Sequence, residues 1–134
     1  MNNTDNQYDV LVMVVPKDFE RLKYNYKRLY EYLPGRNIYF VGNEEVGELV
    51  SSAGLGERVG WIDENSILSF DRVHAVMEER MSEWLAGRPM PRNITGWYYQ
   101  QFLKMQYARM CKDEYYMVWD GDTIPCRHFS MFSD

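Results

Sequence analysis

The apolar run Tyr115-Tyr116-Met117-Val118-Trp119 leads directly into Asp120-Gly121-Asp122 near the end of the chain. The run has the length and composition of a buried strand, and the two acidic residues stand where that strand would end. In open α/β sheets, ligands bind at the carboxyl ends of the strands. Two carboxylates placed there can hold a hard divalent cation and leave coordination positions for phosphate oxygens. The same D-G-D sequence is also consistent with an ordinary turn, so the rest of the chain has to decide between the two.

The rest of the chain alternates apolar strands with helical patterns. Strands are expected over residues 8–15, 37–41, 58–62 and 115–119, and helices over residues 18–33, 44–53, 70–85 and 97–111. The first strand, YDVLVMVV, is apolar almost throughout, which is typical of a strand buried on both faces. Strands that alternate with helices predict a mostly parallel sheet with flanking helices, and therefore a Rossmann-like α/β fold.

Acidic residues follow three of the four expected strands. Pro16-Lys17-Asp18 follows the first, Asp63-Glu64 the third, and Asp120-Gly121-Asp122 the fourth. Because the carboxyl ends of parallel strands meet at one edge of a sheet, the three clusters are expected at the same edge. Asp18 also fits the N-cap of the following helix, and Asp63 fits a turn residue. Both interpretations of these two residues remain open.

Composition restricts the class of protein. The 134 residues are expected to form one domain, 46% of them are hydrophobic, and the net charge is -5. Without a cluster of Lys and Arg, nucleic acid is not expected as a partner. The longest apolar stretch, Val10 to Pro16, is too short to span a bilayer, and residues 1–7 lack the pattern of a signal peptide, so a cytoplasmic location is expected. Cys111 and Cys126 are interpreted as reduced thiols.

The expected helix before the last strand carries a polar stripe. At 100° per residue, Trp97, Gln101 and Lys104 fall on one side of it, and Gln100 lies at the margin of that side. A lysine beside two amides and an aromatic ring can pair with a diphosphate or with nearby carboxylates. It can equally extend to solvent over its apolar neighbours.

Two segments of the chain together suggest a family. The block Gly96-Trp97-Tyr98-Tyr99-Gln100-Gln101-Phe102-Leu103-Lys104-Met105 precedes Tyr116-Met117-Val118-Trp119-Asp120-Gly121-Asp122-Thr123. This combination resembles bacterial GT-A fold glycosyltransferases, and in particular glycosyltransferase-like proteins associated with surface polysaccharides. The order of elements resembles that fold over most of the chain, in which this part is the nucleotide-binding half.

The resemblance implies a metal-dependent donor site. Asp120 and Asp122 would bind Mn²⁺ or Mg²⁺ together with the diphosphate of a nucleotide-sugar, with a UDP-sugar the expected donor, for transfer to a polysaccharide or lipopolysaccharide acceptor. Lys104 would act with the two aspartates in catalysis. Substrate binding would involve the first strand's end and the preceding helix, at Pro16, Lys17, Asp18, Asp63, Trp97, Gln100, Gln101 and Lys104.

The sequence differs from the family in how far it continues after the D-x-D. GT-A catalytic domains usually continue for more than a hundred residues after the D-x-D, whereas this sequence ends at Asp134. The expectation is therefore a donor-binding half that is inactive alone and able to self-associate through the face left by a missing half. A non-catalytic interaction module of the same ancestry is the alternative. A phosphatase of the haloacid-dehalogenase type, which also carries a D-x-D after an apolar strand, is the third possibility.

Overall fold

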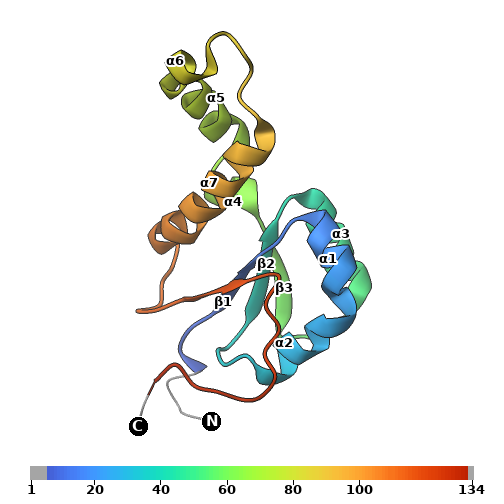
Figure 1. Cartoon of the computed structure of the whole chain (residues 1–134). Helices are drawn as coiled ribbons and strands as arrows, with labels where there is room; N and C mark the ends of the chain where they lie inside the picture. The colour runs from blue at the N-terminus through green and yellow to red at the C-terminus, as the bar shows by residue number, and fades with distance from the viewer. Residues whose placement is uncertain (1–5, 133–134) are drawn as a thin grey trace. The chain divides into compact units, whose positions relative to one another are not determined.

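The computed structural model describes residues 6–132, so residues 1–5 and 133–134 lie outside its description. The chain forms an α/β structure with one parallel sheet (Figure 1). Its strands are β1 (Val10–Met13), β2 (Ile38–Gly42), β3 (Val59–Asp63) and β4 (Met117–Asp120). They lie in the order β3-β2-β1-β4, and every neighbouring pair is parallel. The predicted Rossmann-like α/β fold class is confirmed.

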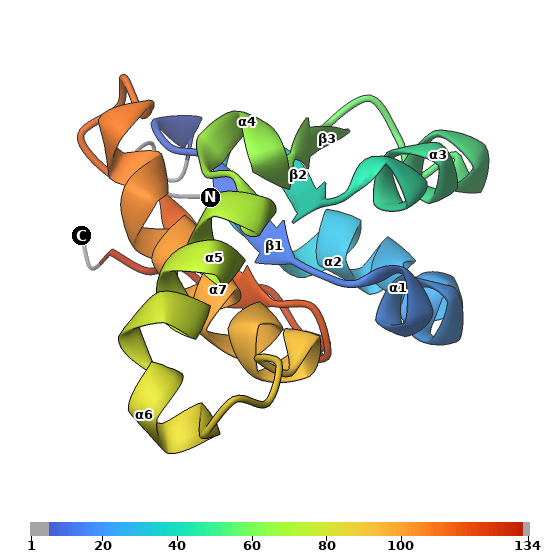
Figure 2. The same cartoon turned by 90° about the horizontal axis from the view of Figure 1, so that it is seen from above.

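The described chain divides into two compact units. The sheet unit consists of the residues up to Asp63 and those from Cys111 onward, and the helical unit is Glu64–Met110. The sheet unit contains α1 (Pro16–Leu22), the 3₁₀ turn η2 (Lys23–Asn25), α2 (Tyr26–Tyr32) and α3 (Glu44–Ala53). Figures 1 and 2 show these helices on the same side of the sheet. The helical unit contains α4 (Glu64–Ile67), α5 (Phe70–Arg80), α6 (Ser82–Leu85), α7 (Arg92–Gln106) and the 3₁₀ turn η3 (Tyr107–Arg109).

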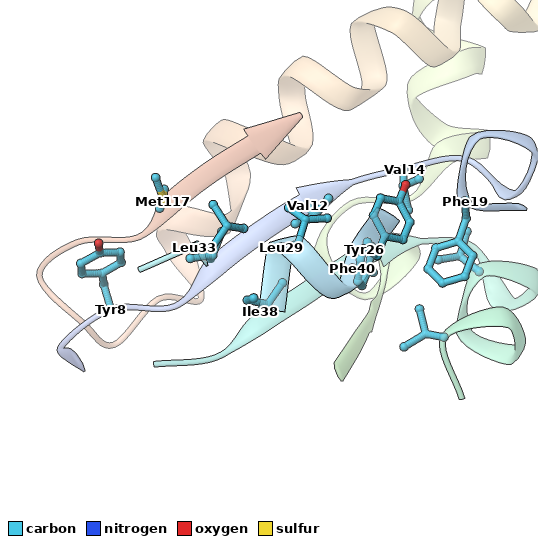
Figure 3. Close-up of a cluster of buried hydrophobic side chains, with 13 residues drawn as sticks. Tyr8, Val12, Val14, Phe19, Tyr26, Leu29, Leu33, Ile38, Phe40 and Met117 are labelled. Atoms are coloured by element: carbon cyan, nitrogen blue, oxygen red, sulfur yellow. The ribbon is translucent and has the colours of Figure 1, made fainter. Parts of the chain in front are cut away.

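A core of buried side chains joins α1, α2 and α3 to the sheet (Figure 3). All four residues of β1 are buried, as the continuous apolar run predicts. Three aromatic rings meet at the centre: those of Phe19, Tyr26 and Phe40 lie pairwise within 5.2 Å, centroid to centroid. Burying a side chain of this size contributes about 2 kcal/mol. These rings therefore fix α1 and α2 against the sheet.

The first predicted helix is wrong in its start and its continuity. The helix begins at Pro16, whose fixed φ suits the first helical position, and Val15 occupies the N-cap. Asp18 therefore lies in the first turn and is not the N-cap. The helix is also interrupted by η2 before α2 begins at Tyr26.

Other boundaries shift by a few residues. The last strand extends to Asp120, so this aspartate belongs to the strand and not to the loop after it. Helix α7 begins at Arg92, directly after Pro91, and not at residue 97 as predicted. The helix predicted over residues 70–85 breaks at Met81 into α5 and α6. Among the residues that the structure describes, no helix is both long and apolar enough to cross a membrane.

Charged side chains tie together the amino-terminal edge of the sheet, where the strands begin. The carboxylate of Asp9 accepts hydrogen bonds from Arg36 at 2.8 and 3.1 Å and from the backbone and side chain of Asn37 at 3.2 Å. Arg36 also pairs with Asp113 at 2.7 Å. These residues precede β1, β2 and β4, so the three strand starts share one ionic network.

Arg58 performs a similar task before β3. Its guanidinium donates to several backbone carbonyls that follow or end α2, including those of Tyr30 and Leu33 at 2.7 Å and Gly35 at 2.9 Å. Burial lowers the pKa of Arg58 from its ordinary value. The side chain thus satisfies carbonyls that the helix end leaves without an intrahelical partner.

Candidate functional site

The candidate site lies at the carboxyl-terminal edge of the sheet, where β1 and β4 end side by side. Met13 of β1 is the register partner of Asp120 in β4. Two residues, Val14 and Val15, then connect β1 to Pro16 at the start of α1. The parallel pairing therefore brings the segments Pro16-Lys17-Asp18 and Asp120-Gly121-Asp122 to neighbouring positions, as the sequence predicted for this edge.

The D-G-D segment forms a turn with both carboxylates exposed. The Thr123 amide donates to the Asp120 carbonyl at 3.1 Å, which closes the turn. The indole Nε1 of Trp119 donates to the Thr123 carbonyl at 2.7 Å and fixes the return of the chain. The Thr123 hydroxyl donates to Asp122 Oδ1 at 3.4 Å. Asp120 and Asp122 are both exposed, so a ligand in solution can reach them.

Gly121 is the residue that lets the turn approach β1 this closely. A Cβ atom at this position would lie 2.6 Å from the Met13 carbonyl oxygen and 3.1 Å from Val14 Cβ. The first of these neighbours is backbone, which cannot move aside without disturbing the strand. The middle residue of the D-G-D segment is therefore restricted to glycine by its packing.

Tyr26 is a residue of this site that the sequence reasoning missed. Its side chain is 1% exposed, and its hydroxyl donates to the Gly121 carbonyl at 2.9 Å. Burial raises the pKa of Tyr26, and the negative charges of Asp18 and Asp122 raise it further, whereas Arg21 lowers it. The hydrogen bond ties α2 to the D-G-D turn. No local pattern reveals this contact, because 95 residues separate its partners.

The residues of the segment Pro16-Lys17-Asp18 form the first turn of α1. Pro16 occupies the first helical turn, Lys17 is exposed, and Asp18 is half-buried. Asp18 forms an exposed ion pair with Arg21, 3.4 Å long and one turn along the helix. Such a pair contributes little to stability. It leaves the Asp18 carboxylate near the D-G-D turn with only a weak local counter-charge.

Asp63 ends β3 at the same edge, but on the far side of it. Two strands, β2 and β1, separate β3 from β4. At about 4.8 Å per strand spacing, Asp63 and Asp120 are about 14 Å apart. Ligands of one cation lie within about 5 Å of each other, given metal–oxygen distances of about 2–2.6 Å. Asp63 therefore cannot share an ion with the D-G-D carboxylates.

The other predicted residues lie together on α7 of the helical unit. Lys104 Nζ donates to Gln101 Oε1 at 3.5 Å, and Gln101 Nε2 donates to the Trp97 carbonyl at 3.4 Å. Gln100 and Lys104 are half-buried, and 61% of Trp97 is exposed. The predicted stripe exists on the helix. Its part in donor binding and catalysis remains a prediction.

The two carboxylates of the D-G-D turn suit a cation whose other coordination positions are filled by a bound ligand and water. Within residues 6–132, no three His, Cys, Asp or Glu side chains gather in a group that could hold a metal ion. Mg²⁺ characteristically uses one or two protein carboxylates and takes its other oxygens from phosphates and water. Asp120 and Asp122 fit this pattern and do not fit a closed, all-protein metal cage.

Comparison with known proteins gives one match. A family of unknown function, DUF6492, matches residues 11–133. The chain belongs to this family. No curated protein and no solved structure matches the chain. The matched residues include both units and the D-G-D turn.

Proposed function

We propose that this DUF6492 member binds the diphosphate of a nucleotide-sugar, together with Mn²⁺ or Mg²⁺, at the D-G-D turn of its sheet unit. In this proposal it is the donor-binding part of a glycosyltransferase-like enzyme. One observation carries it: the pairing of Met13 with Asp120 brings the start of α1 beside a turn with two exposed carboxylates, whose middle carbonyl accepts a hydrogen bond from Tyr26. Acidic side chains at the carboxyl edge of a parallel sheet are the arrangement that metal-bound phosphate ligands require.

The chemistry of sugar transfer explains why a divalent cation would be needed at this site. An acceptor hydroxyl oxygen bonds to the anomeric carbon and loses its proton, while the bond from that carbon to the diphosphate breaks and negative charge develops on the leaving diphosphate. A divalent cation held at the turn would stabilise that charge. Asp120 and Asp122 would hold the cation, and the exposed Lys17 is the positive side chain of the sheet unit proposed to contact the phosphates. A role for Lys104 in catalysis rests on the family resemblance alone.

The remaining predicted residues would contact the rest of the donor. Asp63 lies about 14 Å from the D-G-D turn along the same edge, which suits a contact to ribose or base and not to the metal. Pro16 and Asp18 border the turn itself. Trp97, Gln100 and Gln101 offer a ring face and amides to the sugar or phosphate, and this part of the proposal rests on the family resemblance alone.

A non-catalytic interaction module is the second candidate, because α7 exposes large apolar side chains. Trp97 is 61% exposed and Met105 is 64% exposed, and Tyr98 and Phe102 lie between them with more than a third of their surfaces exposed. Apolar patches of this kind commonly mark contacts between proteins. Oligomers whose abundance rises with protein concentration in size-exclusion chromatography would favour this candidate, including the self-association that the sequence predicts.

A thermal-shift panel tests the first proposal. UDP, GDP, CMP and ADP are each added with and without Mn²⁺ to the wild-type chain, to Asp122→Asn and to Asp71→Asn. The last variant is the matched control, since Asp71 lies on α5 and its side chain is 91% exposed. A ligand at a hundred times its Kd adds about 2.7 kcal/mol of stability and raises Tm by several degrees.

The expected result is a Mn²⁺-dependent shift with UDP in the wild type and in Asp71→Asn, and none in Asp122→Asn. No shift with any nucleotide would contradict donor binding. Hydrolysis of a generic phosphate ester with Mg²⁺, lost in Asp122→Asn, would instead favour the phosphatase alternative.

A further inference from the structure

We infer that Tyr26 is a positioning residue for metal binding. Its hydroxyl holds the carbonyl of Gly121, the residue between Asp120 and Asp122, in place. The inference rests on the proposed function, because it concerns the same D-G-D turn. It assigns a role to a tyrosine in the core of the sheet unit that makes no contact with the ligand itself.

The contact joins the core to the middle of the D-G-D segment. The Tyr26 hydroxyl donates to the Gly121 carbonyl at 2.9 Å, and this carbonyl belongs to the peptide that links Gly121 to Asp122. Rotation of that peptide would redirect the Asp122 side chain. A hydrogen bond from a buried donor opposes such rotation, because breaking it would leave the hydroxyl without a partner in the core.

The donor itself is held in place by aromatic packing. The Tyr26 ring lies 5.2 Å from Phe19 and 5.0 Å from Phe40, centroid to centroid, and the rings are tilted at 55° and 47°. Figure 3 shows Tyr26 among these rings and Val14, with its hydroxyl at the end of the ring that faces the carboxyl end of β1. Since interiors are close-packed, the hydroxyl oxygen has little freedom to follow a moving turn.

The turn is restrained from a second side by β1. A Cβ atom on Gly121 would lie 2.6 Å from the Met13 carbonyl oxygen, so there is no room for a side chain between the turn and the strand. The hydrogen bond from Tyr26 and the contact with Met13 thus grip one residue, and the two carboxylates extend from either side of it. Fixed carboxylates bind a cation without first losing conformational freedom.

A phenol is the suitable donor for this position. Lys or Arg could also donate to the Gly121 carbonyl, but their positive charge would compete with the cation for the nearby carboxylates. The neutral hydroxyl satisfies the carbonyl and leaves the negative charge of Asp18 and Asp122 in place. Groups that orient metal ligands from behind in this way commonly change metal affinity ten- to a hundredfold when removed.

Tyr26→Phe tests the inference, with Tyr99→Phe as its matched control. Phenylalanine keeps the ring packing and removes only the hydroxyl. Tyr99 is also buried, and its hydroxyl also donates to a backbone carbonyl, that of Leu68 at 2.5 Å in the helical unit. The two variants therefore make the same chemical change at different places. Mn²⁺ affinity is measured by electron paramagnetic resonance of the free ion, with UDP present, and stability by urea unfolding.

The expected result is a Kd for Mn²⁺ at least tenfold higher in Tyr26→Phe than in the wild type and in Tyr99→Phe, with a similar loss of stability in both variants. Amide exchange of Thr123, whose N–H closes the turn, should also accelerate in Tyr26→Phe alone. Equal Mn²⁺ affinity in the three proteins would overturn the inference and leave the proposed function intact. A wild-type chain that does not bind Mn²⁺ would overturn both.

Discussion

The two edges of the sheet treat their carboxylates in opposite ways. At the amino-terminal edge, Asp9 is 9% exposed and accepts hydrogen bonds from Arg36 and Asn37. At the carboxyl-terminal edge, Asp120 and Asp122 are exposed, and neutral groups hold their turn, among them the Tyr26 hydroxyl, the Trp119 indole and the Thr123 amide. Both edges belong to the same four strands.

The difference separates charges that hold the fold from charges that are available to a ligand. The Asp9 carboxylate lies against opposite charge, so its binding capacity is already used within the protein. At the D-G-D turn the Asp122 side chain is exposed, and the backbone of the turn is held by neutral groups. Native proteins depart from local stabilisation mainly at functional sites. The proposed function puts its site at the carboxyl-terminal edge, and the amino-terminal edge serves as the reference for comparison.

The largest expected effect belongs to Arg58→Ala at the amino-terminal edge. Removing the guanidinium leaves partly buried carbonyls of Leu33 and Gly35 without their donor. We expect the free energy of unfolding to fall by about 3 kcal/mol, measured in urea. Arg21→Ala is the control, because its ion pair with Asp18 is exposed and worth less than about 1 kcal/mol. Equal losses in the two variants would show that the Arg58 network is not structural.

Gly121→Ala tests the close approach of the D-G-D turn to β1. The new Cβ would meet the Met13 carbonyl oxygen, and overpacking of this kind costs about 2 kcal/mol. Mn²⁺ binding should be lost together with the stability. Gly96→Ala is the control, since nothing lies within 4 Å of that Cβ in α7, and alanine in a helix is worth up to about 1 kcal/mol more than glycine. A stable, metal-binding Gly121→Ala would show that the turn has room to move.

Asp9→Asn measures how much the ion pair between Asp9 and Arg36 contributes to stability. The change keeps the shape of the side chain and removes the charge that Arg36 contacts at 2.8 Å. We expect a loss of about 1.5 kcal/mol in urea unfolding, because hydrogen bonds to charged groups are the stronger ones. Mn²⁺ affinity should not change. A variant as stable as the wild type would remove the contrast between the two edges.

Alkaline pH tests the environment of Tyr26. Its pKa is raised in the folded state, mainly by burial, whereas an unfolded tyrosine titrates near pH 10. Stability is therefore complete below about pH 10 and falls as the pH rises above it, because the unfolded state releases the proton first. At about pH 10.5 the wild type should lose about 0.8 kcal/mol more than Tyr26→Phe, relative to pH 8. Parallel unfolding curves for the two proteins would contradict this environment.

Asp122→Asn should change stability least, by less than about 0.5 kcal/mol. Its side chain is exposed, its hydrogen bond from the Thr123 hydroxyl is 3.4 Å long, and asparagine can still accept it. Asp9→Asn is the same substitution at the other edge, so the pair compares the edges directly. A loss in Asp122→Asn as large as that in Asp9→Asn would show that the D-G-D carboxylates stabilise the fold.

The sequence predicted which edge of the sheet would bind a ligand, but it did not predict that the two edges differ in how their carboxylates are held. Charged residues adjoin the apolar runs at both ends, as Asp9 and Asp120 illustrate, and no local pattern tells a clamped carboxylate from an accessible one. The D-G-D turn was singled out because ligands bind at the carboxyl ends of parallel strands. The opposite roles of the two edges depend on Arg36 and Tyr26, which reach Asp9 and Gly121 over 27 and 95 residues.

The sequence by itself determined the fold class, the number of strands and the edge at which the acidic segments meet. These follow from local periodicity and from the rule that strand–helix–strand units give parallel strands. Only the tertiary structure decided the strand order, which sets β4 beside β1 and β3 two strands from β1. It alone separated Asp63 from the D-G-D turn and brought the Tyr26 hydroxyl to the Gly121 carbonyl. Periodicity records which face of an element is buried, whereas contacts between distant segments depend on how the whole core packs.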